Sequence, residues 1–206
     1  MNARFVLLAA FVIGTALVNW PKDTYSWSPS PASLQPRFEA ASCPFVLGPD
    51  QIEGQTVTCG FVTVPEMRGA HAGQTIRLAV AVFKAQDTAS SPPLIFLGGG
   101  PGSAILGSFG PVITESLAEG LTADHDLILF DQRGAGFSQP SLACQEMTDL
   151  KYQNLGLHIS REDETDGTVQ AALRCRDRLR QAGINLAAYT TAASVADVDD
   201  IRRALG

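Results

Sequence analysis

The sequence predicts an α/β fold with a mixed, mainly parallel sheet that begins with an antiparallel hairpin. Two short apolar runs, at residues 94–97 and 126–130, each lead into a glycine-rich segment, which is typical of strands covered on both faces. Before them, residues 59–65 and 75–83 carry alternating apolar positions with a glycine-containing turn between them, which predicts the hairpin. Helical spacing follows each apolar run, and strands that alternate with helices indicate an α/β architecture.

Length and composition indicate one folded domain. The chain has 206 residues, of which 45% are hydrophobic and 17% charged, and this size supports a single sizeable core. The net charge is -6, and Lys and Arg gather in no dense patch. A nucleic-acid partner is therefore not expected.

The first 20 residues are expected to form a signal peptide or, alternatively, an uncleaved N-terminal membrane anchor. Arg4 supplies a positive charge, and the apolar run over residues 5–18 suits a signal-peptide core and is short for a membrane span. Ala16 offers a cleavage site. Residues 21–42, rich in Ser and Pro, predict a linker, and residues 43–206 form the expected domain. We expect export to the periplasm or the exterior.

Four cysteines fit an exported protein: Cys43, Cys59, Cys144 and Cys175. They form no Cys-x-x-Cys pair and no histidine cluster accompanies them, so no metal site is expected. Pairing Cys43 with Cys59 and Cys144 with Cys175 is favoured because each bridge closes a short local loop. The alternative is that some of these thiols remain free.

The remaining elements are expected to be helical or irregular. Helices are predicted over residues 112–121, 168–181 and 195–205, and a loop-rich insertion over residues 140–166. Ser194 is the expected N-cap of the last helix. The expected apolar faces are Val169, Ala172, Leu173 and Leu179 in the second helix, and Val195, Val198, Ile201 and Leu205 in the third.

The first glycine loop, residues 98–102, has the sequence Gly-Gly-Gly-Pro-Gly at the carboxyl end of a predicted strand. Ligands bind at this edge of open α/β sheets, and glycines leave backbone N–H groups unshielded. Such a loop holds a phosphate or an oxyanion. Phosphate motifs need G-x-G-x-x-G opening a helix or G-x-x-x-x-G-K-[ST], and neither occurs here. The glycines alone leave two interpretations open, an oxyanion site and a plain structural turn.

The second glycine loop, residues 131–138, has the sequence Asp-Gln-Arg-Gly-Ala-Gly-Phe-Ser and also ends a predicted strand. Asp131 and Arg133 are expected to brace this loop, through an ion pair with each other or through hydrogen bonds to adjacent loops. A direct catalytic role for Asp131 is the alternative.

Together the two loops resemble those of α/β-hydrolases of the proline iminopeptidase and tripeptidyl aminopeptidase group. That family carries His-Gly-Gly-Pro-Gly after one strand and Asp-x-Arg-Gly-x-Gly-x-Ser after the next. Further matches lie at residues 59–66 and 189–206, so the resemblance covers about residues 43–206. Gly98 departs from the pattern, because many relatives carry histidine there, and this bears on the subfamily more than on the fold.

The resemblance implies an acyl-transfer hydrolase without a cofactor, acting on a peptide or small acyl substrate. In this family a serine on a G-x-S-x-G elbow attacks a carbonyl carbon, with a histidine as base and an aspartate that orients it. The first glycine loop would give one backbone N–H to the oxyanion. Gly99 and Gly100 are the two candidate donors.

No G-x-S-x-G occurs in these 206 residues. Ser103, Ser108 and Ser138 lack the flanking glycines and are expected to be loop or cap residues. The three histidines, His71, His125 and His158, all fall in predicted loops. Since the family order is serine, aspartate, histidine, we expect the whole triad beyond Gly206, and this chain to be an inactive N-terminal part of the enzyme.

The leading hypothesis is thus the N-terminal part of an exported serine hydrolase, an aminopeptidase that removes residues from peptide N-termini. An esterase-type parent is one alternative. A non-catalytic binding module on the same scaffold and an enzyme reassembled from two chains are the others.

Overall fold

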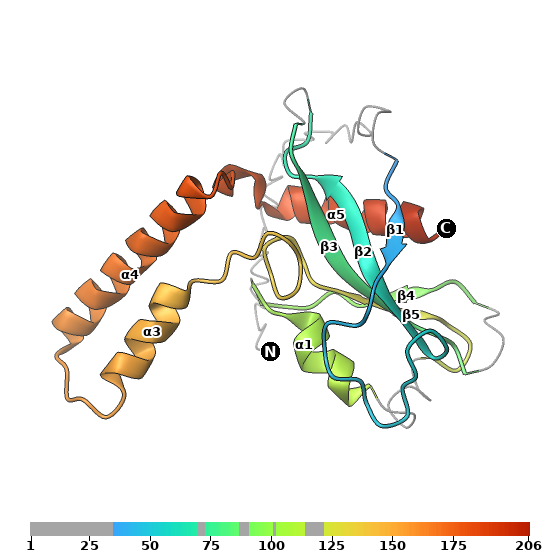
Figure 1. The fold of residues 1–206 in the computed structure, drawn as a ribbon, viewed down its shortest axis with the longest axis horizontal. Helices are drawn as coiled ribbons and strands as arrows, with labels where there is room; N and C mark the ends of the chain where they lie inside the picture. Colours follow the sequence, from blue (N-terminus) through green and yellow to red (C-terminus); the bar gives the residue numbers. More distant parts are fainter. Residues whose placement is uncertain (1–34, 70–72, 87–90, 101, 114–121) are drawn as a thin grey trace, which may run out of the picture.

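The computed structural model describes residues 35–69, 73–86, 91–100, 102–113 and 122–206 (Figure 1). Within them one five-stranded sheet has the strand order β1-β2-β3-β5-β4. Its strands are β1 (Phe38–Ala40), β2 (Val57–Pro65), β3 (Thr75–Phe83), β4 (Leu94–Ile95) and β5 (Leu127–Phe130). The expected signal peptide and most of the helix predicted over residues 112–121 lie outside the described residues.

Strands β2 and β3 form the predicted antiparallel hairpin, paired along their full length. Strand β1 falls inside the segment expected to be a linker and pairs antiparallel with β2. On the other side β3 pairs antiparallel with β5, and β5 pairs parallel with β4. The sheet is mixed, as predicted, but its described part contains one parallel pair, because the long hairpin and both of its neighbours run antiparallel.

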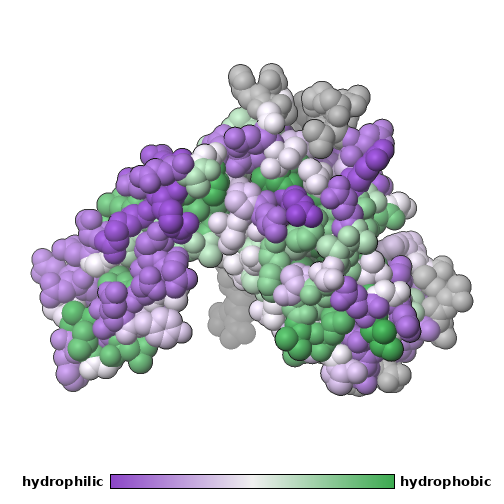
Figure 2. All heavy atoms as spheres, in the orientation of Figure 1, coloured by the Kyte–Doolittle hydropathy of each residue, from purple (hydrophilic) through white to green (hydrophobic). Residues whose placement is uncertain are grey.

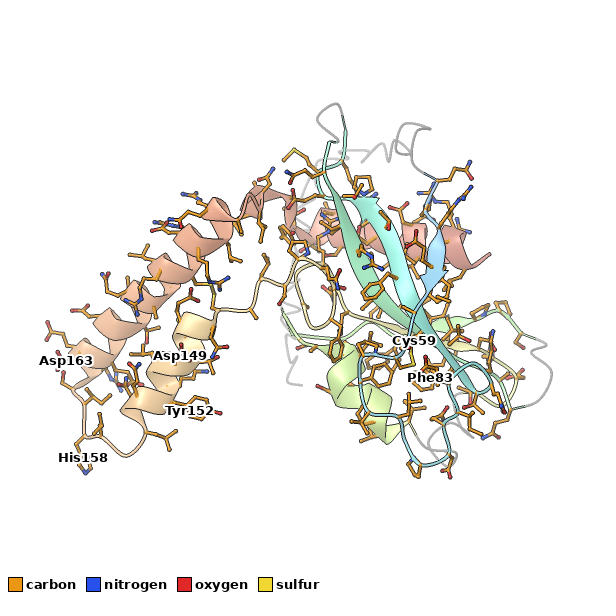
Figure 3. All side chains as sticks on the ribbon, viewed as in Figure 1. Cys59, Phe83, Asp149, Tyr152, His158 and Asp163 are labelled. Atoms are coloured by element: carbon orange, nitrogen blue, oxygen red, sulfur yellow. A yellow bond between two sulfur atoms is a disulfide. The ribbon has the colours of Figure 1, made fainter. Side chains whose placement is uncertain are left out.

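The sheet is covered on both faces, which makes a three-layer α/β arrangement. Alternate strand residues point to opposite faces. One face packs against the short helix α1 (Ile105–Phe109) through Val57, Cys59, Ala79, Ala81, Phe83, Leu127 and Leu129. The other packs against α5 (Thr191–Leu205) through Val62, Val64, Ile76, Leu78, Val80, Val82, Ile128 and Phe130. Cys59 and Phe83 lie in the first of these layers (Figure 3).

Strand β4 corrects the expectation that residues 94–97 form a strand buried on both faces. Its strand covers two residues, and Leu94, Phe96 and Leu97 are exposed, Leu97 by 62%. The reason is the place of β4 in the sheet. It lies at the end of the strand order, with β5 as its single neighbour among the described strands. Strand β5 has a neighbouring strand on each side, and in the described part of the chain β4 lacks the second one, so its side chains are more exposed.

Two helices replace the loop expected over residues 140–166. Helix α3 (Gln145–Asn154) and helix α4 (Arg161–Gln181) form a projecting pair beside the sheet, here called the arm (Figure 1). The Oγ of Ser160 accepts a hydrogen bond from the Asp163 N–H and caps α4. This Ser-x-x-Asp pattern, followed by an acidic first turn, was the sequence signal for the earlier helix start.

The arm buries a different face of α4 from the one predicted. Ala171, Cys175 and Leu179 are buried, whereas Val169 and Leu173 are exposed. A disulfide joins Cys175 to Cys144 at the start of α3, and this bridge selects the face that meets α3. Figure 2 shows apolar side chains at the far end of the arm, where the exposed residues are Tyr152, Leu155, Leu157 and Ile159.

Helix α5 begins four residues before the predicted start at Val195. Its N-cap is Thr190, whose Oγ accepts from the Ala193 N–H, in place of the expected Ser194. Ile201 is buried as predicted, but Val195 is 63% exposed. Among the described residues, no helix combines the length and apolarity that crossing a membrane requires.

Candidate active site

The first glycine loop continues from β4 and is held from two sides at Gly98. The Gly98 carbonyl accepts a hydrogen bond from the Gln132 side chain at 3.3 Å. On the other side, a Cβ at position 98 would lie 2.0 Å from Cδ1 of Ile105. A side chain at position 98 would therefore require Ile105 to move, because the Ile105 side chain fills that space. The histidine that many members of the resembling family carry at this position would displace Ile105 in this chain.

Asp131 links the two glycine loops. Its Oδ1 accepts hydrogen bonds from the Ile105 N–H at 2.6 Å and the Leu106 N–H at 3.0 Å, at the start of α1. Its Oδ2 accepts from the Phe137 N–H at 2.8 Å. The side chain is fully buried. Gly136 makes this possible, because a Cβ there would lie 2.1 Å from Asp131 Oδ2.

Arg133 ties the second loop to α5 and to the end of β2. It donates to both carboxylate oxygens of Asp197 at 2.7 Å and to the carbonyls of Glu66 and Ala188 at 2.7 Å. Both ion-pair side chains are 1% exposed. Arg68 also pairs with Asp197. Arg133 and Asp131 thus hold different elements, each through bonds to adjacent segments.

Glu66 joins the same network from the end of β2. Its Oε1 accepts from the Tyr189 hydroxyl and from the Asn185 N–H, each at 3.2 Å. Burial raises the pKa of the Tyr189 hydroxyl, and the Glu66 carboxylate raises it further. Tyr189 therefore stays protonated and serves as a hydrogen-bond donor at neutral pH.

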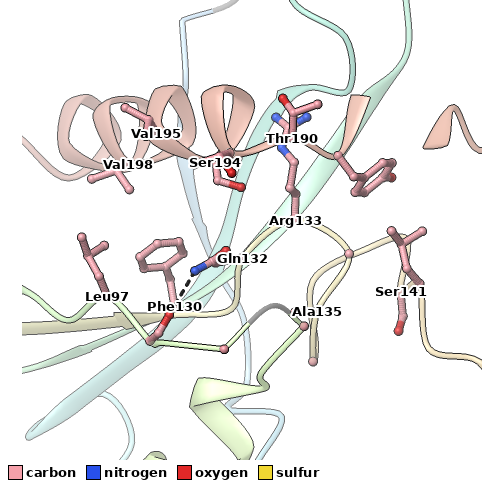
Figure 4. A pocket seen from close by; sticks show the side chains of 18 of the residues that line it. Leu97, Phe130, Gln132, Arg133, Ala135, Ser141, Thr190, Ser194, Val195 and Val198 are labelled. Atoms are coloured by element: carbon pink, nitrogen blue, oxygen red, sulfur yellow. Dashed lines mark hydrogen bonds between the residues drawn. The ribbon is translucent and has the colours of Figure 1, made fainter. Parts of the chain in front are cut away.

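A cavity of about 620 Å³ lies between the two glycine loops, α5 and the segment before α3. Figure 4 shows Leu97 and Phe130 on one side, Val195 and Val198 of α5 opposite them, and Gln132 between. The polar wall includes Gly100, Tyr189, Thr190 and Ser194. An apolar cavity with a few polar groups is typical of a small-molecule or peptide site. The two predicted loops therefore meet at one cavity.

The other candidate residues lie away from this cavity. The structure contains disulfides Cys43–Cys59 and Cys144–Cys175, the pairing that loop length favours. In the described residues one potential metal-ligand group, Cys144 with Glu146 and Cys175, was found, but both sulfurs are consumed by the disulfide. His158 lies at the far end of the arm (Figure 3). His71 lies outside the described residues.

His125, Ser103 and Ser138 have structural partners, whereas Ser108 lies within α1 and not in the expected loop or cap. His125 Nδ1 lies 2.7 Å from the Pro92 carbonyl oxygen. Ser138 Oγ donates to the Asp131 carbonyl and accepts from the Ala79 N–H. Ser103 Oγ donates to the Gly99 carbonyl. These contacts agree with the expected roles in loops.

Sequence reasoning assigned no specific contact to Asp197, Glu66 or Gln132. In the helix predicted over residues 195–205, Asp197 falls in the first turn, where an acidic residue needs no further reason. Its burial depends on Arg133, which lies 64 residues away. The available signal was that Asp197 and Asp200 fall within residues 189–206, which resemble the family.

A family model and two curated proteins are similar to this chain. The family model described as "alpha/beta hydrolase fold" matches residues 92–206, more than half of the chain. The tripeptidyl aminopeptidase of Streptomyces coelicolor is 31% identical over 162 residues, which is 73% of this chain and 28% of that protein. The tripeptidyl aminopeptidase of Streptomyces lividans is equally similar, with 29% of its length covered.

The chain thus spans less than a third of the length of these curated relatives. The family match covers the first glycine loop, the second glycine loop and α5, which together surround the cavity. The fold, the loop order and the matched region agree, and the chain belongs to the α/β-hydrolase fold family.

Proposed function

We propose that this chain carries the oxyanion-binding part of an exported serine peptidase of the aminopeptidase type. The nucleophilic serine, the aspartate and the histidine would lie on polypeptide outside these 206 residues. The chain by itself would then be inactive. The observation that carries the proposal is the position of the first glycine loop, which ends β4 and lines the cavity with Gly98, Gly100 and Gly102.

The chemistry follows from this position. In acyl transfer a serine oxygen adds to the substrate carbonyl carbon, and the carbonyl oxygen becomes an oxyanion. A backbone N–H fixed before the reaction stabilises that charge without reorganisation, and loss of one such donor costs roughly 10²–10³ in turnover. Asp131 and Gln132 support the loop, and neither needs to touch the substrate.

Peptides are the proposed substrate class, because the similar Streptomyces proteins are named tripeptidyl aminopeptidases. The cavity has a volume of about 620 Å³, which lies within the usual range for pockets that hold a small ligand. Two disulfides fit an oxidising compartment outside the cytosol.

The test compares the 206-residue chain with the longer product that would carry a G-x-S-x-G segment. A fluorophosphonate probe labels an activated serine, so we expect labelling of the longer product and none of this chain. Stoichiometric labelling of this chain would refute its inactivity, and an unlabelled longer product would refute the serine mechanism.

Substrate assays separate the alternatives. An aminopeptidase releases a fluorophore from a tripeptide with a free N-terminus and spares the same tripeptide with an acetylated N-terminus. An esterase-type enzyme hydrolyses a small acyl ester without this requirement. A binding module processes none of the three substrates, even when the longer product is folded.

A further inference from the structure

We propose that Ser103 is a positioning residue of the first glycine loop, whose hydroxyl holds the peptide plane that carries the N–H of Gly100, the oxyanion donor. The inference rests on the proposed function and deepens it. Both glycines were equal candidates in the sequence. The hydrogen bonds of the loop distinguish them.

The first step concerns the peptide between Gly99 and Gly100. The Ser103 hydroxyl donates a hydrogen bond to the Gly99 carbonyl oxygen at 3.0 Å. This peptide is trans, and in a planar trans peptide the C=O and the following N–H point in opposite directions. The Gly100 N–H is therefore directed away from Ser103, and the hydrogen bond from the hydroxyl restrains this peptide plane.

The second step concerns the turn that follows. The Ser103 N–H donates to the Gly100 carbonyl oxygen at 3.2 Å, so Ser103 holds two successive carbonyl groups. Gly102 has φ +81°, a left-handed conformation that favours glycine. Because both carbonyls turn toward Ser103, the N–H of Gly100 is left on the other side of the loop.

The third step concerns the cavity. Gly100 lines it, whereas Ser103 is absent from its lining and is exposed elsewhere. The direction away from Ser103 is thus the direction of the cavity. Gly100 also has φ +83°, and a Cβ there would lie 3.0 Å from Ser103 Oγ, so this conformation requires glycine.

The same reasoning excludes Gly99 as the donor. The carbonyl oxygen of Gly98 accepts from Gln132, and Gln132 lines the cavity (Figure 4). In the trans peptide between Gly98 and Gly99, the Gly99 N–H must then point away from Gln132. Gly99 itself is not among the cavity-lining residues.

Ser103 is itself held in place by its neighbours. It precedes α1, whose Ile105 and Leu106 N–H groups are bound by the buried Asp131 carboxylate. The hydroxyl thus belongs to a fixed turn, although the residue is exposed. Removing the hydroxyl frees one peptide plane without removing buried contacts.

The experiment uses the longer, serine-containing product and the variants Ser103→Ala and Ser103→Thr. Ser108→Ala is the matched control, because Ser108 is an exposed serine of α1 that does not line the cavity. We measure kcat and KM on the free tripeptide substrate and the inhibition constant of a peptide aldehyde, whose adduct resembles the tetrahedral intermediate. Gln132→Ala removes the side chain that binds the Gly98 carbonyl oxygen, and so tests the peptide plane between Gly98 and Gly99.

Ser103→Ala is expected to lower kcat about tenfold, below the 10²–10³ loss of an entire donor, with KM within about twofold. The inhibition constant of the peptide aldehyde should rise in parallel, because its adduct also needs the oxyanion donor. Ser103→Thr and Ser108→Ala should retain kcat within about twofold. Thermal unfolding of Ser103→Ala should match that of Ser108→Ala.

Several results would overturn the inference. Unchanged kcat in Ser103→Ala, a loss confined to KM, or an equal loss in Ser103→Thr each contradicts a positioning hydroxyl. A larger kcat loss in Gln132→Ala than in Ser103→Ala assigns the donor to Gly99. If the unmodified longer product resists the fluorophosphonate probe, the proposed function has failed and not this inference alone.

Discussion

Arg133 offers a quantitative test of how the second glycine loop is held. Its guanidinium donates two hydrogen bonds to the Asp197 carboxylate and three to the carbonyls of Pro65, Glu66 and Ala188. Both side chains of the ion pair are almost wholly buried. Arg133→Ala therefore leaves a buried carboxylate and three carbonyl groups without this donor.

The expected loss of stability can be bounded. Breaking a buried ion pair by removing one partner costs about 3–5 kcal/mol. Asp197 keeps Arg68 as a second cation, which places the expectation near the lower limit, about 3 kcal/mol. For a urea m-value of about 2–3 kcal/mol/M, the unfolding midpoint should fall by roughly 1–1.5 M.

The assay is urea unfolding followed by far-ultraviolet circular dichroism at pH 7. Arg202→Ala is the matched control, because Arg202 pairs with Asp199 at 2.9 Å but is 65% exposed. Such an exposed pair contributes about 0–1 kcal/mol. A midpoint shift in Arg133→Ala no larger than that in Arg202→Ala would refute the conclusion that this buried network fixes the second glycine loop against α5.

Two further predictions concern the second loop and the arm. Gly136→Ala should destabilise the protein by about 2–4 kcal/mol, because Gly136 has φ +50° and an added Cβ would lie 2.1 Å from Asp131 Oδ2. The control is Gly156→Ala, at φ +79° with nothing within 4 Å of an added Cβ, which should cost only the backbone strain of about 1–2 kcal/mol. Equal losses of stability in urea unfolding would contradict the predicted collision. In the arm, the hydrogen bond from Arg178 lowers the pKa of Glu146 from 4.5 to about 2. A pKa lowered by folding stabilises the folded arm above about pH 4.5, and the contribution disappears as the pH falls through about 2. An NMR titration of the Glu146 carboxyl checks this, with Arg178→Gln expected to return the pKa toward 4.5 and an unshifted pKa in the unmodified protein as the contrary result.

The hairpin and the two glycine loops could be predicted because their signals are local. Alternation over β2 and β3 reflects the two-residue period of a strand, and the glycines mark turns where the backbone must come close to other atoms. The loop-closure argument for Cys43–Cys59 and Cys144–Cys175 is likewise local. The errors at β4 and in the arm have a different origin, because the burial of a strand or helix face depends on which neighbour it meets.

The sequence by itself determined the fold class, the antiparallel hairpin and the presence of two glycine loops, each at the carboxyl end of a strand. Only the tertiary structure decided that Arg133 meets Asp197 and that Ile105 fills the space beside Gly98. It also decided which peptide plane Ser103 holds. Such contacts join residues distant in sequence or depend on the direction of a single peptide group. Neither leaves a periodic pattern in the chain, so packing had to be known before the candidate donors could be distinguished.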